Sequence, residues 1–117
     1  MENFEQDVKR VARIIRVIEH KSRFEFISEE RVNETTHRIK AMVNGKDVAF
    51  FMGDIHCGPF SLDVIWPDGE GYYETEVIYL KQLYHIESDL LTDFIIAALE
   101  DNRSEKYDAL YQRVFLY

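Results

Sequence analysis

The chain has 117 residues, the length of one domain, and 46% of them are apolar, enough for a hydrophobic core without a metal or a disulfide. Its net charge is −8, its single cysteine cannot form a bridge within the chain, and no apolar run is as long as a membrane span. Charged residues crowd the first twenty positions, which is incompatible with a signal peptide. We therefore expect a soluble, cytoplasmic single domain spanning residues 1–117, with no membrane contact.

The negative charge is concentrated in the middle of the chain. Residues 1–46 contain ten Lys or Arg and eight Asp or Glu, whereas residues 47–102 contain twelve Asp or Glu and a single base, Lys81. A field of one sign repels nucleic acids and membrane surfaces and attracts basic proteins. The alternative explanation is ordinary solubility, since acidic domains are common.

The first predicted element is an amphipathic helix from Glu2 to about Lys21. Its apolar residues recur every three or four positions, at Phe4, Val8, Val11, Ile15 and Ile18. Lys and Arg side chains cover much of the opposite face. Such a basic face is either solvated or lies beside the acidic middle of the same protein.

A short strand is predicted at residues 23–28, followed by a polar loop near residues 29–34. Asn44 and Gly45 then lie between two alternating runs, and both tolerate the positive φ of a two-residue type I′ hairpin turn. The register that follows pairs Val43 with Lys46, Ala41 with Val48, Ile39 with Phe50 and His37 with Met52. The apolar members of these pairs then share the core-facing side of a sheet.

A second hairpin is predicted over residues 60–80, turning through the Pro- and Gly-containing stretch at 67–71. A four-residue loop, Pro67–Glu70, keeps one face consistently apolar. The register that follows pairs Val64 with Tyr73, Leu62 with Thr75, Phe60 with Val77, Asp63 with Glu74 and Ser61 with Glu76. Asp63 and Glu74 then repel each other on the outer face.

Two helices are predicted at the C-terminal end. The first runs from Ser88 to about Asp101 with a broad apolar face, and Ser104 is placed to cap the second. The order of elements is an N-terminal helix, an antiparallel sheet of four to five strands and two C-terminal helices. This order predicts a two-layer α+β domain.

The stretch from Asp54 to Phe60 holds the cysteine and is the main candidate for chemistry. Neighbouring side chains of an extended segment point to opposite faces, which argues against Cys57 and His56 as a nucleophile–base pair; a pair of Cys57 with His37 stays open. The ligand spacing of a zinc site and the known cofactor motifs are missing from the sequence. We expect a bend between two hairpins, with Cys57 as a small half-buried apolar residue, and no catalytic residue, metal or cofactor.

The predicted functional surface is the outer face of the second hairpin together with its loop. In the register above, an aromatic side chain lies among acids on this face, which is typical of a protein-binding surface. The residues that we expect to bind a partner are Asp63, Ile65, Asp68, Glu70, Tyr72, Glu74 and Glu76. The alternative is that a third layer covers Ile65 and Tyr72.

These features favour a stoichiometric protein-binding module of inhibitor or immunity type. It would occupy a basic surface of a nucleic-acid-handling protein, such as a nuclease toxin, without binding nucleic acid itself. Two alternatives belong to other classes. One is a chaperone-like or adaptor domain that binds a peptide at a sheet edge or in a groove beside the first helix, and the other is a small enzyme that uses Cys57 with a histidine.

Overall fold

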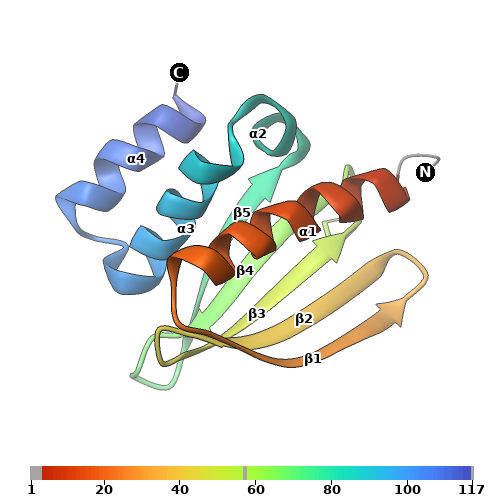
Figure 1. The fold of residues 1–117 in the computed structure, drawn as a ribbon, viewed down its shortest axis with the longest axis horizontal. Coiled ribbons are helices and arrows are strands. Elements are labelled where there is room, and N and C mark those ends of the chain that lie inside the picture. The colour runs from red at the N-terminus through yellow and green to blue at the C-terminus, as the bar shows by residue number, and fades with distance from the viewer. Residues whose placement is uncertain (1–3, 57, 117) are drawn as a thin grey trace.

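The computed structural model describes residues 4–56 and 58–116, in which one helix precedes a sheet and three helices follow it (Figure 1). The elements are α1 (Phe4–Lys21), β1 (Phe24–Asn33), β2 (Thr36–Val43), β3 (Lys46–Gly53), β4 (Ser61–Pro67), β5 (Tyr73–Tyr79), α2 (Leu80–His85), α3 (Ser88–Asp101) and α4 (Glu105–Phe115). The predicted order and the α+β class are confirmed, with the short helix α2 as an addition. Within these residues, none of the helices is both long and apolar enough to cross a membrane.

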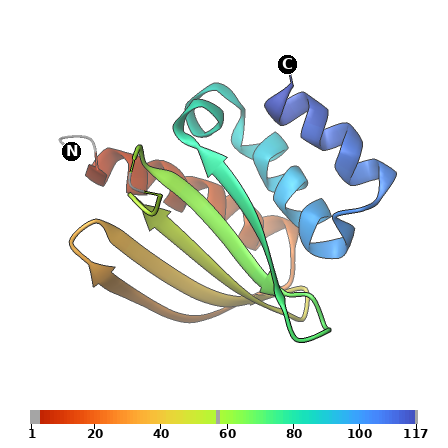
Figure 2. The ribbon, with the colours of Figure 1, turned by 180° about the vertical axis from the view of Figure 1, so that it is seen from behind.

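The five strands form one antiparallel sheet in which each strand pairs with the next along the chain. The helices lie on one face of this sheet, and the described part of the chain places none on the other face (Figures 1 and 2). α3 packs beside α1, and α4 packs against α3. The sheet and the helices thus form the two predicted layers.

The hydrophobic core lies between α1, α3 and the covered face of the sheet. Val11, Ile14 and Ile18 of α1 are fully buried there, together with Phe50 of β3 and Phe94 of α3. Burying one large apolar side chain contributes about 1.5–3 kcal/mol to the free energy of folding. The packing of this apolar face, more than helix propensity, therefore holds α1 on the sheet.

The hairpin between β2 and β3 has the predicted turn and register. The backbone φ is 52° at Asn44 and 83° at Gly45, so both residues have the left-handed conformation that a type I′ turn requires. The predicted pairing continues along both strands as far as His37 opposite Met52. The apolar side of this hairpin accordingly faces the helices.

The predicted register of the second hairpin, between β4 and β5, is wrong by three residues. The observed pairs are Asp63 with Val77, Val64 with Glu76, Ile65 with Thr75, Trp66 with Glu74 and Pro67 with Tyr73. The prediction required an apolar partner for each core-facing residue, whereas Glu74 and Glu76 lie on that face because polar groups at the C-terminal helices bind them. The repulsion expected between Asp63 and Glu74 does not arise.

β1 is longer than predicted, because the stretch expected to be a polar loop continues the strand to Asn33. Glu29 and Arg31 pair with Ile39 and His37 of β2. Polar side chains fit this strand because β1 is at the edge of the sheet, where most of its residues stay exposed.

The two long C-terminal helices agree with the sequence. α3 runs from Ser88 to Asp101, and Ser104 caps α4 by accepting a hydrogen bond from the Tyr107 backbone N–H at 3.0 Å. The ring of Phe94 stacks on that of Tyr107 with 5.3 Å between centroids. This aromatic contact attaches α4 to α3.

Part of the basic face of α1 is bound within the molecule. The Arg10 guanidinium donates hydrogen bonds where α2 ends and α3 begins, to the carbonyl oxygens of Leu83 and Ile86 and to Ser88 Oγ. At the end of α1, Lys21 Nζ lies 3.0 Å from Asp93 Oδ1 of α3. These basic side chains join α1 to the acidic half of the chain, which is one of the two alternatives that the sequence allows.

Candidate partner-binding surface

The seven residues predicted to bind a partner do not share one face. Asp63 and Ile65 lie on the open face of the sheet, Glu74 and Glu76 lie on the face toward the helices, and Asp68, Glu70 and Tyr72 belong to the β4–β5 loop. The single acidic face that the sequence predicted is therefore wrong. The binding role of these residues remains a prediction.

Glu74 and Glu76 are bound by side chains at the C-terminal helices. The Tyr107 hydroxyl donates to Glu76 Oε1 at 2.6 Å, and Asn102 Nδ2 donates to Glu74 Oε1 at 3.2 Å. Burial raises the pKa of the Glu76 carboxyl, and the hydrogen bond from Tyr107 partly opposes that shift. Glu76 thus attaches α4 to β5 and is not an exposed acid of a binding face.

Asp63 is also withdrawn from the surface, since only 3% of it is exposed. Its Oδ1 accepts a hydrogen bond from Ser61 Oγ at 2.9 Å, and its Oδ2 accepts one from His56 Nε2 at 2.7 Å. A buried carboxylate needs such donors to replace water. Asp63 therefore anchors the segment between β3 and β4 to the open face of the sheet.

The Cys/His chemistry considered from the sequence gains no geometric support. Cys57 lies outside the described residues, so its role at a bend and its pairing with His37 stay untested. His56 donates to Asp63 on the open face, whereas His37 lies on the helix side of the sheet, with its ring 5.5 Å from that of Phe4. Within residues 4–56 and 58–116, no group of three or more His, Cys, Asp or Glu is arranged to hold a metal ion.

The open face around Ile65 is mixed in character. Ile65, Phe51 and Val77 are half-buried there, and the Arg38 guanidinium lies 5.8 Å from the centre of the Phe51 ring. Arg38 also forms an ion pair with Glu30 across β1 and β2. The third layer considered for Ile65 is absent from the described residues, but of the acids predicted on the two strands this face carries only Asp63, which is buried.

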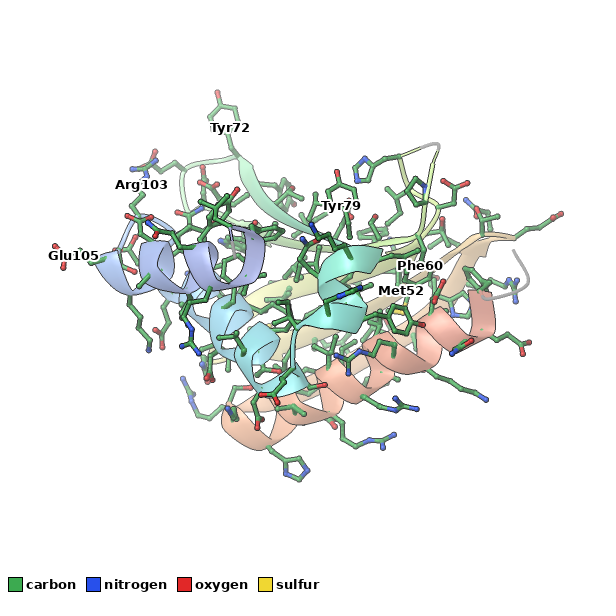
Figure 3. All side chains as sticks on the ribbon, turned by 90° about the horizontal axis from the view of Figure 1, so that it is seen from above. Met52, Phe60, Tyr72, Tyr79, Arg103 and Glu105 are labelled. Atoms are coloured by element: carbon green, nitrogen blue, oxygen red, sulfur yellow. The ribbon has the colours of Figure 1, made fainter. Side chains whose placement is uncertain are left out.

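The β4–β5 loop holds an internal network that fixes its shape. Asp68 Oδ1 accepts hydrogen bonds from the backbone N–H groups of Glu70 at 2.7 Å and Tyr72 at 3.2 Å, and the Asp68 N–H donates to the Tyr72 carbonyl at 2.9 Å. Tyr72 is 73% exposed and points away from the body of the protein (Figure 3). The loop presents an aromatic ring on a fixed turn, which reduces the entropy lost when a partner contacts it.

A groove of about 450 Å³ lies between this loop and the corner that joins α3 to α4. Five carboxylates line it, from Asp68, Glu70, Glu74, Glu100 and Asp101. Two cations, Lys46 and Arg103, accompany them, and Lys46 Nζ already donates to the Leu99 carbonyl at the end of α3. Trp66 and Leu99, both buried, also line it. We call this site the acidic groove.

Sequence reasoning identified part of this groove and missed the rest. Asp68, Glu70 and Glu74 were predicted as binding residues, but Glu100 and Asp101 were assigned only to the end of a helix. The break after Asp101 indicated a corner between two helices. The sequence held no signal that this corner lies beside a turn some thirty positions earlier, because that contact depends on how α3 packs on the sheet.

Comparison of the chain with protein-family models, curated proteins and solved structures found no match. The function has to be argued from the geometry and charge of the site.

Proposed function

We propose that this protein is a stoichiometric binding module that takes up a basic segment of a partner protein in the acidic groove. The observation that carries the proposal is the groove itself, which is lined by five carboxylates and two cations. Part of the negative charge of residues 47–102 thus lies together in a concave surface. Clefts lined by one sign of charge focus the electric field and speed the arrival of an oppositely charged partner.

The contacts available in the groove suit a protein partner. Carboxylates form strong charge-assisted hydrogen bonds with Arg and Lys, and Arg pairs with a carboxylate through two parallel bonds. Tyr72 and Tyr73, which are 73% and 74% exposed, stand at the same end of the β4–β5 hairpin. Exposed aromatic residues beside complementary charge are common anchors of protein interfaces.

The partner class follows from the sign of the charge. Basic surfaces on proteins are most often sites that bind the phosphates of nucleic acids. A protein whose acidic groove covers such a surface would inhibit its owner by occupation, as an immunity protein does for a nuclease toxin. This activity is a proposal supported by the groove and by the charge distribution of the chain.

The test reverses charge within the groove and, separately, outside it. The immobilised protein would be used to capture a basic protein from a lysate of the source cells, and the Kd of the purified pair would then be measured at low and high salt. Glu70→Lys with Glu100→Lys should weaken binding by roughly 2 kcal/mol, or about thirtyfold. The matched control is Glu19→Lys with Glu29→Lys, which makes the same change in net charge at exposed positions on α1 and β1.

The control variant should bind within a few-fold of the wild type. Equal loss in both variants would show that net charge alone attracts the partner, and unchanged binding by the groove variant would exclude the groove. Binding that does not weaken with salt would favour the adaptor alternative.

One observation favours that alternative. β1 is at the edge of the sheet, and it exposes Phe26, Ile27 and Val32. An exposed edge strand can pair with an extended peptide through backbone hydrogen bonds, which depend little on salt. A chaperone-like or adaptor domain would use this edge.

A further inference from the structure

A second pocket lies at the opposite end of the strands from the acidic groove. β3 begins at Lys46, which lines the groove, and ends at Gly53, next to the pocket. The pocket has a volume of about 550 Å³ and is formed by the first turn of α1, the β1–β2 turn, the segment between β3 and β4, and Leu80. This volume is within the range of sites that enclose a ligand group.

The floor of the pocket is apolar. Phe4, Phe60 and Leu80 line it, and the rings of Phe4 and Phe60 meet edge to face with 5.9 Å between centroids. Figure 3 labels Phe60 near the start of α1, where its ring contacts that of Phe4. This floor suits the aliphatic part of a side chain or a small apolar group.

The walls are acidic. Four carboxylates line the pocket, those of Glu5, Asp7, Glu34 and Asp54, and Arg31 is the one cation among the lining residues. The Arg31 guanidinium donates to the backbone carbonyls of Asn33 and Glu34 and lies 6.0 Å from the centre of the Phe4 ring. Its hydrogen bonds therefore go largely to the β1–β2 turn, and negative charge remains in excess in the pocket.

Asp7 gives this pocket a fixed carboxylate. The residue is only 7% exposed, and the Tyr84 hydroxyl donates to its Oδ1 at 2.5 Å. Burial and the hydrogen bond to Asp7 raise the pKa of Tyr84 to about 12. A tyrosine is protonated at neutral pH in any case, so the hydroxyl remains a donor to Asp7. A carboxylate held in surroundings of low polarity attracts a cation more strongly than one in water does.

The arrangement fits an organic cation better than a metal ion. The described residues contain no group of three or more His, Cys, Asp or Glu that could hold a metal, so these four carboxylates do not converge on one point. Acids spread around an apolar floor match a ligand with a charged end and an apolar stem. We propose that this pocket, which we call the α1 pocket, binds an arginine side chain flanked by apolar residues in a peptide segment of a partner protein.

This inference goes beyond the acidic groove and does not depend on it. The two sites are at opposite ends of the strands, so one partner would have to span the sheet to reach both. The α1 pocket also differs in kind, because it combines apolar lining residues with scattered carboxylates. Its occupant is a single anchoring side chain rather than a broad basic surface.

The experiment uses a fluorescent hexapeptide of alternating leucine and arginine, blocked at both ends, and measures its Kd by anisotropy with the intact protein. The first control peptide replaces each arginine with citrulline, which keeps the shape and removes the charge. It should bind about tenfold more weakly or not at all. A peptide with glycine in place of leucine should also lose affinity.

Two protein variants locate the site. Glu5→Gln with Glu34→Gln removes two exposed carboxylates of the pocket and should weaken binding about fivefold. Glu19→Gln with Glu29→Gln removes two exposed carboxylates that line neither the α1 pocket nor the acidic groove, and it should leave the Kd unchanged. In a ¹⁵N–¹H spectrum, the backbone amides of Phe60 and Leu80 should shift on binding, while that of His20 should not.

Three results would overturn the proposal: equal affinity for the citrulline peptide, unchanged affinity of the pocket variant, or the same loss in both variants. The last of these would show diffuse attraction to an acidic protein. The peptide experiment does not involve the partner of the acidic groove, so a negative result would refute the α1 pocket and would not bear on the groove. In the same way, a groove variant that keeps its partner would refute the groove and would not bear on the α1 pocket.

Discussion

The β2–β3 hairpin turns in two residues, whereas the β4–β5 hairpin uses five, and the two are held in register by different means. In the first, Asn44 and Gly45 both have positive φ, and this turn geometry allows one pairing of the strands that follow. In the second, the loop from Asp68 to Tyr72 is held by hydrogen bonds to Asp68, but its sequence does not single out one pairing of the strands. The pairing is selected by which side chains the helices accept.

The register of the β4–β5 hairpin is selected by hydrogen bonds to two glutamates on the covered face of the sheet. Glu74 receives a hydrogen bond from Asn102, and Glu76 receives one from Tyr107. Trp66, which is 3% exposed, occupies the same face opposite Glu74. In a hairpin with a two-residue turn, the turn itself thus sets the register. In a hairpin with a longer loop, tertiary contacts of the strands set it.

The largest expected effect comes from removing the tertiary contact of the second hairpin. Trp66→Ala should lower the free energy of unfolding by about 3–5 kcal/mol, because it leaves a cavity where a large ring packs under the helices. The measurement is urea denaturation. Tyr73→Ala, at an exposed position on the neighbouring strand, is the control and should change stability by about 0.5 kcal/mol or less. A loss below 1 kcal/mol for Trp66→Ala would show that packing does not hold this hairpin.

A smaller effect is expected from lengthening each turn by one glycine. Inserted between Asn44 and Gly45, the extra residue abolishes the type I′ turn and should cost about 1–2 kcal/mol. Inserted after Gly69, it disturbs the hydrogen bonds of Asp68 to the backbone of Glu70 and Tyr72 but leaves the contacts of Glu74 and Glu76 in place. Closure entropy adds about 0.2 kcal/mol, and the total loss should be about 0.5–1 kcal/mol. Thermal unfolding of the two variants side by side would measure the difference. If the two variants lost the same stability, the registers of the two hairpins would not be set by different means.

The smallest effect concerns the pH dependence that Glu76 adds to the second hairpin. Its pKa is raised above the ordinary value of 4.5 in the folded protein, so between these two values the folded state binds the proton more tightly than the unfolded state. This contribution to stability is present below the ordinary pKa and is lost as the pH rises through the raised one. Glu76→Gln should remove it.

The measurement is the melting temperature of Glu76→Gln and wild type across the acidic range. Relative to the variant, the wild type should lose stability as the pH rises above 4.5. At neutral pH the variant should be as stable as the wild type or slightly more so, because glutamine can still accept from Tyr107 without a buried charge. A relative gain for the wild type with rising pH would have the wrong sign for this explanation.

Local patterns were sufficient to predict most of the elements. The apolar spacing around Val11 and Ile18 placed α1, Ser104 marked the start of α4, and Asn44 with Gly45 set a hairpin to the residue. Each signal acts within a few positions of the chain. The polar stretch from Glu29 to Glu34 was wrongly predicted to be a loop, because an edge strand tolerates polar residues that a central strand would not.

The candidate site was less predictable, since its residues meet only through packing. Asp63 carries a charge that composition assigns to the surface, yet Ser61 and His56 supply the donors that allow its burial. Glu100 and Asp101 join Glu70 only after α3 has docked on the sheet. The donors to Asp63 are 2 and 7 positions away, whereas those to Glu74 and Glu76 come from residues 28 and 31 positions later. A sequence shows that a side chain is charged, but it does not show which donors the fold brings to that charge.

The Arg10 contacts have a consequence for the order in which the protein assembles during synthesis. They join α1 to acceptors 73, 76 and 78 positions later in the chain. The N-terminal helix therefore leaves the ribosome long before the residues that receive its guanidinium, whereas each hairpin can pair as soon as its two strands emerge. Until Ser88 has been made, the apolar stripe of α1 is not closed in by α3 and is open to chaperones or to neighbouring chains. A nascent chain stalled after β5 would have a nearly complete sheet and an α1 whose apolar stripe is not yet covered by α3.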